Sequence, residues 1–206
     1  MSVITAITPQ VKNVDRCNIY VDNTFYCGMQ LETVIKNKLK VGITIDKQEL
    51  CLMQLESEKS VALNKAMGFI SNSMKTSKAV KDYLATKGYT QPVCQYVIDK
   101  LLEYGFVNDS EYAKAYVRSY SKNRGAKLIK MQLRAKGVSD SDMAEALESI
   151  DNELESATAV AEKYLKNKQI DNKNMQKAYK YLLSKGFSYE TASSVIKGIY
   201  KECEEF

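Results

Sequence analysis

The chain has 206 residues, 45% of them hydrophobic and 27% charged, with a net charge of +5. Its hydrophobic content is ordinary for a globular protein, so disorder is not the default, and its length allows one large domain or two to three small ones. Trp and His are absent, which removes the usual near-neutral general base and the commonest zinc ligand. The five cysteines are scattered, so we expect reduced thiols. The N-terminal ten residues lack a basic flank, and no apolar run approaches the roughly 20 residues that span a bilayer. We therefore expect no signal peptide and a cytoplasmic location.

Residues 1–57 predict a small β-rich module with no chemistry of its own, suited to a scaffold or docking role. In residues 3–7, Val3, Thr5 and Ile7 recur at every second position before Pro9, which predicts a short edge strand. Two β-rich runs, 17–22 and 24–29, meet at an Asp-Asn pair and predict a hairpin. The remaining expected elements are a helix from Leu31 to Leu39 stopped by Gly42, a strand over 43–45, and a helix over 47–56 that starts from the capping-box pair Asp46 and Glu49.

The rest of the chain repeats with a period of 49 residues, which separates Gly88, Gly137 and Gly186. Each Gly follows a Lys, has a Leu four residues before it, and is followed by an apolar residue and then Ser or Thr. A helix tends to end at a left-handed Gly and the next tends to begin at Ser, Thr, Asp or Asn. These glycines are therefore predicted to occupy equivalent tight turns between helices.

Three cap positions in each copy predict three helices per repeat. They lie 28 and 12 residues before the Gly and two residues after it; in chain order they are Ser60, Thr76 and Thr90, then Asp109, Gly125 and Ser139, then Thr158, Asn174 and Ser188. Equivalent helices are expected to start within about four residues of the 49-residue offset.

The apolar spacing supports the same organisation. In the helix after each Gly, apolar residues recur at i, i+1 and i+4, which forms one buried stripe. We predict a mainly α protein of tandem three-helix bundles, since repeats of this length form supersecondary units that stack on their neighbours. The expected domains are the N-terminal module (1–57) and repeats over 58–108, 109–151 and 152–206.

The middle repeat contains a strongly basic stretch over residues 114–136. These 23 residues hold no acid and eight basic side chains: Lys114, Arg118, Lys122, Arg124, Lys127, Lys130, Arg134 and Lys136. Such a stretch points to an anionic partner, either nucleic acid or an acidic protein surface, with a solvated helix face as the alternative. Lys127, Lys130 and Arg134 recur at i, i+3 and i+7, so they are expected to share one face of a helix.

A search for catalytic motifs finds no P-loop, G-x-G-x-x-G or G-x-S-x-G sequence. The carboxylate pair Asp140 and Asp142 is better explained by favourable charges in the first turn of a helix. We therefore predict a protein that is not an enzyme and uses no cofactor or metal.

The central repeat resembles the signature of the RecX family. Members share a G-[YF]-[IV]-[DN]-D-x-x-[FY]-A-x-x-[FY]-[VI]-R motif, a basic G-x-x-[RK]-[IL] segment and L-x-x-K-G-[IV]. The matching residues here are 105–113 and 116–118, then Gly125 with 127–129, and 133–138. The likeness covers about residues 60–200, and the N-terminal module is similar to the β-rich extension of some members. One departure is Gln132, where the family often carries an acid.

The resemblance implies a negative regulator of the RecA recombinase, acting in DNA repair, homologous recombination and the SOS response. RecX-like proteins bind along the RecA–single-stranded-DNA filament and lower its ATPase and strand-exchange activity, by blocking extension or promoting disassembly. The implied partners are the RecA filament and single-stranded DNA, with no membrane, and we expect a monomer. The alternatives are a direct nucleic-acid-binding architectural protein and a scaffold whose basic patch is incidental.

Overall fold

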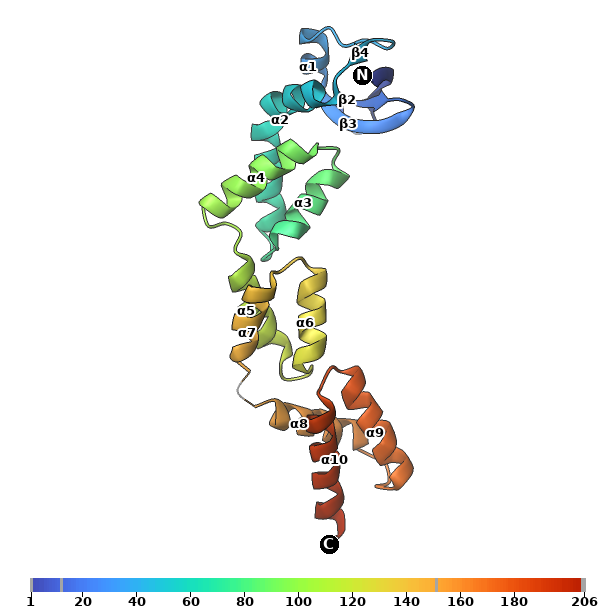
Figure 1. Ribbon diagram of the computed structural model, residues 1–206, viewed down its shortest axis with the longest axis vertical. Coiled ribbons are helices and arrows are strands. Elements are labelled where there is room, and N and C mark those ends of the chain that lie inside the picture. The colour runs from blue at the N-terminus through green and yellow to red at the C-terminus, as the bar shows by residue number, and fades with distance from the viewer. Residues whose placement is uncertain (1, 12, 151, 205–206) are drawn as a thin grey trace. The chain divides into compact units, whose positions relative to one another are not determined.

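The computed structural model describes residues 2–11, 13–150 and 152–204. The chain divides into two compact units, Met1–Asn108 and Asp109–Phe206, which are described separately below (Figure 1). The first unit holds a small sheet and one helical bundle, and the second holds two helical bundles. The mainly α fold with three three-helix bundles and an N-terminal β module is thus confirmed.

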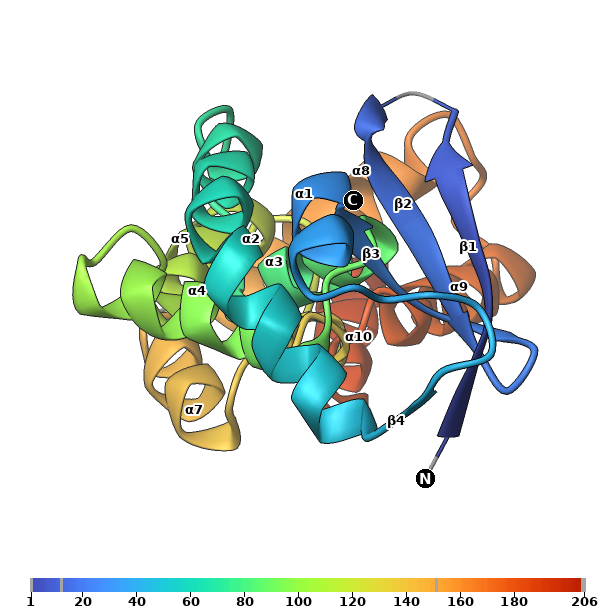
Figure 2. The same ribbon diagram turned by 90° about the horizontal axis from the view of Figure 1, so that it is seen from above.

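An antiparallel sheet with strand order β3-β2-β1-β4 opens the first unit. Its strands are β1 (Ser2–Gln10), β2 (Asn13–Val21), β3 (Thr24–Gln30) and β4 (Thr44–Ile45). Figure 2 shows the long strands β1 and β2 side by side. The predicted hairpin is confirmed, because Asp22 and Asn23 adopt φ of 50° and 63°, as the two central residues of a type I′ turn require.

The expectation that residues 3–7 form an edge strand is wrong. β1 lies between β2 and β4, because Ser2 and Val3 pair with Ile45 and Thr44. Strand β4, predicted over 43–45, has only two residues and follows helix α1 (Leu31–Lys36). Its pairing with β1 joins segments that lie far apart in the sequence, so no local pattern reveals it. Ile4, Ile19 and Met29 are fully buried in the core that the sheet forms with α1 and the start of α2 (Lys47–Ile70).

Helix α2 is continuous over 24 residues, whereas the sequence predicted separate helices near 47–56 and 61–71. Asp46 caps its start by accepting a hydrogen bond from the Gln48 amide, as expected, but Ser60 lies in its interior and caps nothing. One buried stripe follows the helix from the sheet into the bundle at intervals of four residues: Leu50, Gln54, Glu58, Ala62 and Ala66. Two residues of this stripe, Gln54 and Glu58, are polar, so a search for regularly spaced apolar residues does not predict a continuous helix.

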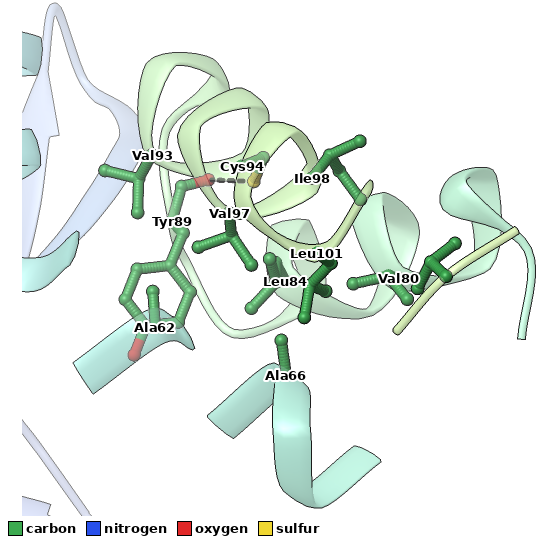
Figure 3. Close-up of a cluster of buried hydrophobic side chains, with 11 residues drawn as sticks. Ala62, Ala66, Val80, Leu84, Tyr89, Val93, Cys94, Val97, Ile98 and Leu101 are labelled. Carbon is green, nitrogen blue, oxygen red and sulfur yellow. Dashed lines mark hydrogen bonds between the residues drawn. The ribbon is translucent and has the colours of Figure 1, made fainter. Parts of the chain in front are cut away.

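The first bundle combines the second half of α2 with α3 (Ser77–Thr86) and α4 (Gln91–Glu103). Figure 3 shows Leu84, Val97 and Leu101 among the side chains that fill the space between these helices. Thr76 caps α3 by accepting a hydrogen bond from the Ala79 amide, and Pro92 lies in the first turn of α4, where no helical hydrogen bond is lost.

The second unit contains two bundles, each with its own core. Ile129, Leu133 and Met143 lie in the core of the middle bundle, and Leu182 and Phe187 in that of the third. The helices are α5 (Asp109–Tyr120), α6 (Ala126–Ala135) and α7 (Asp140–Glu148), then α8 (Glu153–Leu165), α9 (Asn172–Ser184) and α10 (Tyr189–Glu204).

The three repeat glycines occupy equivalent turns, as predicted. Gly88, Gly137 and Gly186 have φ of +82°, +84° and +89°. In each turn the amide two residues beyond the helix-ending Lys donates a hydrogen bond to the Leu carbonyl of that helix: Tyr89 to Leu84, Val138 to Leu133, and Phe187 to Leu182. The left-handed backbone at each Gly makes this helix end possible.

The 49-residue offset holds for the second and third helices of each bundle and fails for the first. Helices α4, α7 and α10 begin at residues 91, 140 and 189, and α3 and α6 begin at 77 and 126. Helix α9 begins three residues early because Asp171, rather than Asn174, is its cap. Thr158 lies inside α8, which is capped by Asn152. In both helices the residue that caps the helix precedes the predicted one in the sequence.

Candidate partner-binding face

The eight predicted basic residues fall on two helices and the loop between them. Five side chains are exposed and three are half-buried. Lys114 and Arg118 lie on α5, Lys122 and Arg124 in the following loop, Lys127, Lys130 and Arg134 on α6, and Lys136 at the end of α6. Lys127, Lys130 and Arg134 are all exposed while Ile129 and Leu133 point into the core, so the expected basic face of α6 exists.

The Arg124 side chain contacts both α5 and α6 within the middle bundle. Its Nη1 atom donates hydrogen bonds to Gln132 Oε1 at 2.7 Å and to the Tyr116 hydroxyl at 3.3 Å. Its guanidinium carbon lies 4.1 Å from the centroid of the Tyr120 ring. Arg124 thereby ties α5 to α6. Gln132 supplies a neutral acceptor at the position where the family pattern often has an acid.

Lys114 and Arg134 have acidic partners that lie outside the acid-free stretch. Lys114 Nζ lies 2.8 Å from Glu145 of α7 and 3.5 Å from Glu111, and the hydrogen bond to Glu145 raises the pKa of the Lys114 ammonium. Arg134 Nη2 lies 2.5 Å from Asp140, whose carboxyl pKa is lowered by that hydrogen bond.

These two pairs differ in how far they restrict the cation. The Arg134 and Asp140 side chains are 61% and 73% exposed, so water screens their pair and an anionic partner can replace Asp140. Lys114 is 32% exposed and bridges α5 to α7, so it is less available. The sequence pattern alone could not reveal the contacts with Glu145 and Asp140, because they depend on how α7 packs beside α5 and α6.

The remaining cations are the ones best placed for a partner. Among the described residues, Arg118, Lys122 and Lys130 have no ion pair or hydrogen bond from their side chains. Lys127 Nζ lies 5.7 Å from the centroid of the Tyr189 ring, which leaves its charge uncompensated. The structure therefore concentrates the candidate face on Arg118, Lys122, Lys127 and Lys130, with Arg134 beside them.

The start of α6 is fixed against the third bundle, a contact that the sequence did not reveal. The Gly125 amide donates to the Lys185 carbonyl at 2.9 Å and the Lys127 amide to the Gly186 carbonyl at 3.2 Å. The Ala126 amide donates to Glu153 Oε1 at 3.0 Å. The backbone amides at the start of α6, which have no acceptor within the helix, thus bind acceptors of the third bundle. The candidate face is therefore formed by side chains and not by the helix N-terminus.

A largely apolar cavity of about 500 Å³ lies beside this junction. Its lining includes Leu128 and Met131 of α6 and Tyr189 of α10, and Met131 and Tyr189 are 61% and 66% exposed. The sequence did not single out Met131 and Tyr189, because each lies close to core positions in a helix with an amphipathic pattern. In the part of the chain that the structure describes, no group of three or more Cys, Asp or Glu side chains is arranged to hold a metal ion.

Comparison with known proteins assigns the whole chain. Four family models match consecutive parts: the regulatory protein RecX N-terminal domain over residues 2–46, and the first, second and third RecX three-helix domains over 62–101, 108–147 and 151–196. The chain belongs to the RecX family. Family membership agrees with the resemblance seen in the central repeat and identifies a regulatory protein.

Individual RecX relatives are similar over nearly the full length. The regulatory protein RecX of Clostridium perfringens strain SM101 is 34% identical over 203 residues, covering 96% of both chains. That of Bacillus subtilis strain 168 is 35% identical over 211 residues, covering all of this chain and 80% of the relative.

Solved RecX structures share the fold. A crystal structure of regulatory protein RecX aligns with a TM-score of 0.63 at 24% identity, over 95% of this chain and 98% of that one. RecX from Lactobacillus salivarius aligns with a TM-score of 0.64 at 29% identity, over 70% and 97% of the respective chains. In the described residues, no helix is long and apolar enough to cross a membrane.

Proposed function

We propose that this RecX-family protein is a negative regulator of the RecA recombinase that binds the RecA–single-stranded-DNA filament in the cytoplasm as a monomer. Binding inhibits the ATPase and strand-exchange activities of the filament. Membership of a family of regulatory proteins supports this proposal, and the observation that carries it is the set of exposed cations on α5, the following loop and α6, of which Arg134 alone has an ion pair among the described residues. Arg118, Lys122, Lys127, Lys130 and Arg134 are the proposed contacts.

The proposed mode of action is binding without catalysis. The filament presents phosphates and acidic side chains, and a cluster of exposed lysines and arginines attracts both. A single exposed ion pair contributes only about 0–1 kcal/mol, so several cations have to act together. Lys127, Lys130 and Arg134 can do so because they project from one face of one helix.

A titration of RecA ATPase on single-stranded DNA tests this function. Turnover of the RecA from the same organism should fall as the protein is added, while the protein alone should hydrolyse neither ATP nor DNA. A parallel mobility-shift titration with free DNA separates the two modes of action. Inhibition at concentrations well below those that shift free DNA supports binding to the filament. Unchanged turnover at a several-fold excess of the protein would refute the proposal.

A further inference from the structure

The largely apolar cavity beside α6 lies wholly within the second unit and opens to solvent. Its apolar side chains are Leu128 and Met131 of α6, Leu183 of α9, Phe187 of the turn that follows, and Tyr189 at the start of α10. Phe187 is buried, whereas Met131 and Tyr189 are largely exposed. The volume of about 500 Å³ lies within the range of protein clefts that bind ligands, so the cavity has room for an apolar group of another molecule.

Three polar side chains of the lining already have hydrogen-bond partners inside the second unit. The Glu153 carboxylate accepts from the Ala126 amide at 3.0 Å and from the Thr191 hydroxyl at 3.3 Å. The hydroxyls of Ser184 and Ser188 form hydrogen bonds within the third bundle. A polar ligand would have to compete with these internal bonds, and burying an unpaired polar group is unfavourable. The lining therefore favours an apolar occupant.

Exposed cations of α6 surround the mouth of the cavity. Lys127 is part of the lining, and its Nζ atom lies 5.7 Å from the centroid of the Tyr189 ring. Met131 follows Lys127 by four residues and precedes Arg134 by three, so these three side chains share one helix face. Lys130 is exposed next to Met131 in the sequence. A segment that places an apolar side chain in the cavity therefore brings its neighbouring residues close to these cations, which attract carboxylates.

We propose that this cavity takes an apolar side chain of a partner protein, from a segment that has acidic residues beside it. The inference rests on the proposed function, within which it assigns the contact at α6 to the protein component of the filament and not to the DNA. A nucleic-acid strand fits less well, because its phosphates need several cations and the lining supplies only Lys127. A second copy that met this face with its own α6 would bring like charges together.

Inhibition of RecA ATPase on single-stranded DNA by the full-length chain, at low and at high salt, tests this inference. Met131→Ser should raise the half-inhibiting concentration about tenfold, because burying a methionine side chain contributes a free energy of this order. The loss should persist at high salt, since salt screens charges and not apolar contacts. Met131→Leu should inhibit like the parent. The matched control is Ile170→Ser, which removes an exposed apolar side chain outside the cavity and should also inhibit like the parent.

Photo-crosslinking identifies the occupant, with benzoylphenylalanine in place of Met131. On RecA-coated single-stranded DNA, the cross-link should form to the RecA polypeptide. A cross-link to the DNA or to a second copy of this chain, or no cross-link, would overturn the inference. Full inhibition by Met131→Ser, a loss that vanishes at high salt, or an equal loss in Ile170→Ser would overturn it too. In each of these outcomes a parent chain that inhibits leaves the proposed function intact. A parent chain that does not inhibit RecA refutes the proposed function and, with it, this inference.

Discussion

At the scale of single residues, Gly125 has no room for a side chain. A Cβ atom there would lie 2.3 Å from the Gly186 carbonyl oxygen and 2.3 Å from the Phe187 nitrogen, and both neighbours are backbone atoms that cannot rotate away. We therefore expect Gly125→Ala to lower the free energy of unfolding by about 1–3 kcal/mol, as overpacking does in well-packed sites. Urea denaturation followed by circular dichroism measures this change.

Gly198→Ala is the matched control for this substitution. Gly198 lies in α10, and a Cβ atom there would meet nothing within 4 Å. Alanine at an open helical position should raise stability by about 0.5–1 kcal/mol. If the two variants unfold at the same denaturant concentration, the close approach of α6 to the α9–α10 turn does not exist in solution.

A buried ion pair joins the sheet to α2 in the first unit. Arg16 Nη1 contacts Glu58 Oε2, and the guanidinium carbon lies 4.9 Å from the centroid of the Tyr89 ring. Arg16 is 3% exposed and Glu58 is fully buried. Desolvation raises the pKa of Glu58, and the Arg16 charge opposes that rise. Arg16 thus permits a carboxylate to stay buried where the sheet meets the helix.

Arg16→Met should lower the free energy of unfolding by about 3–5 kcal/mol near neutral pH, because it leaves Glu58 buried without its ion-pair partner. The pKa of Glu58, already raised above its ordinary 4.5, should then rise further. A raised folded-state pKa favours folding below pH 4.5, and this advantage is lost as the pH rises through the folded-state value. The deficit of the variant should therefore grow from acid to neutral pH. Urea titrations at several pH values measure it, and a pH-independent deficit would contradict this account.

At the scale of elements, the continuity of α2 follows from partners that lie far away in the sequence. Gln54 Nε2 donates to the Gly28 carbonyl and, at 3.0 Å, to the Gly88 carbonyl, while Gln54 Oε1 accepts from the Thr90 amide at 2.7 Å. These contacts satisfy the Gln54 side chain in the buried stripe, and Arg16 pairs with Glu58 one turn further along it. An apolar pattern cannot anticipate them, which explains why a break was predicted at Ser60.

Val61→Pro distinguishes one helix from two. If a helix began after Ser60, proline at residue 61 would occupy its first turn and be tolerated. In the interior of a continuous α2, it should lower the free energy of unfolding by about 3 kcal/mol or more. Asn172→Pro is the control, because residue 172 is the exposed first residue of α9 and should change stability little. Thermal unfolding compares the two, and a near-neutral Val61→Pro would contradict a single helix.

Features set by the local backbone were predictable, and features set by packing between repeats were not. The left-handed turns at Gly88, Gly137 and Gly186 and the caps at Thr76 and Ser139 depend on a few neighbouring residues, so the sequence predicts them. The contact of Gly125 with the Gly186 turn and the pairing of Lys114 with Glu145 join segments that no spacing rule connects. The proposed contacts on α6 were predictable because exposed lysines at helical spacing need no distant partner.

The exposed face of α6 yields a direct test of function. Changing Lys127, Lys130 and Arg134 together to Glu should raise the half-inhibiting concentration in the RecA ATPase assay about tenfold, since three contacts of roughly 0.5 kcal/mol each sum to about 1.5 kcal/mol. Melting temperature should change little, because each exposed substitution usually costs within about 0.5 kcal/mol.

The matched control reverses three exposed lysines on α9, Lys173, Lys177 and Lys180, which recur at i, i+4 and i+7 and therefore also share one helix face. This variant should inhibit like the parent. An α6 variant that folds and still inhibits fully would mean that its basic face is only solvated, and that the binding surface lies elsewhere in the chain.

At the scale of the whole molecule, the two compact units each contain complete hydrophobic cores. The sheet and first bundle supply the cores of Met1–Asn108, and the middle and third bundles supply those of Asp109–Phe206. Within the second unit, the Gly125 and Glu153 contacts join the two bundles. We keep the predicted domains, an N-terminal module over 1–57 and helical repeats over 58–108, 109–151 and 152–206, as a proposal.

Fragments 1–108 and 109–206 should therefore each fold and unfold cooperatively, which circular dichroism with thermal denaturation measures. All eight basic residues predicted from the sequence, including the five proposed contacts, belong to the second fragment. Fragment 109–206 should accordingly lower RecA ATPase, more weakly than the full chain if the first unit adds contacts, whereas fragment 1–108 should not. A folded fragment 1–108 that inhibits while fragment 109–206 does not would move the binding surface to the first unit, since the cations of α5 and α6 are absent from it.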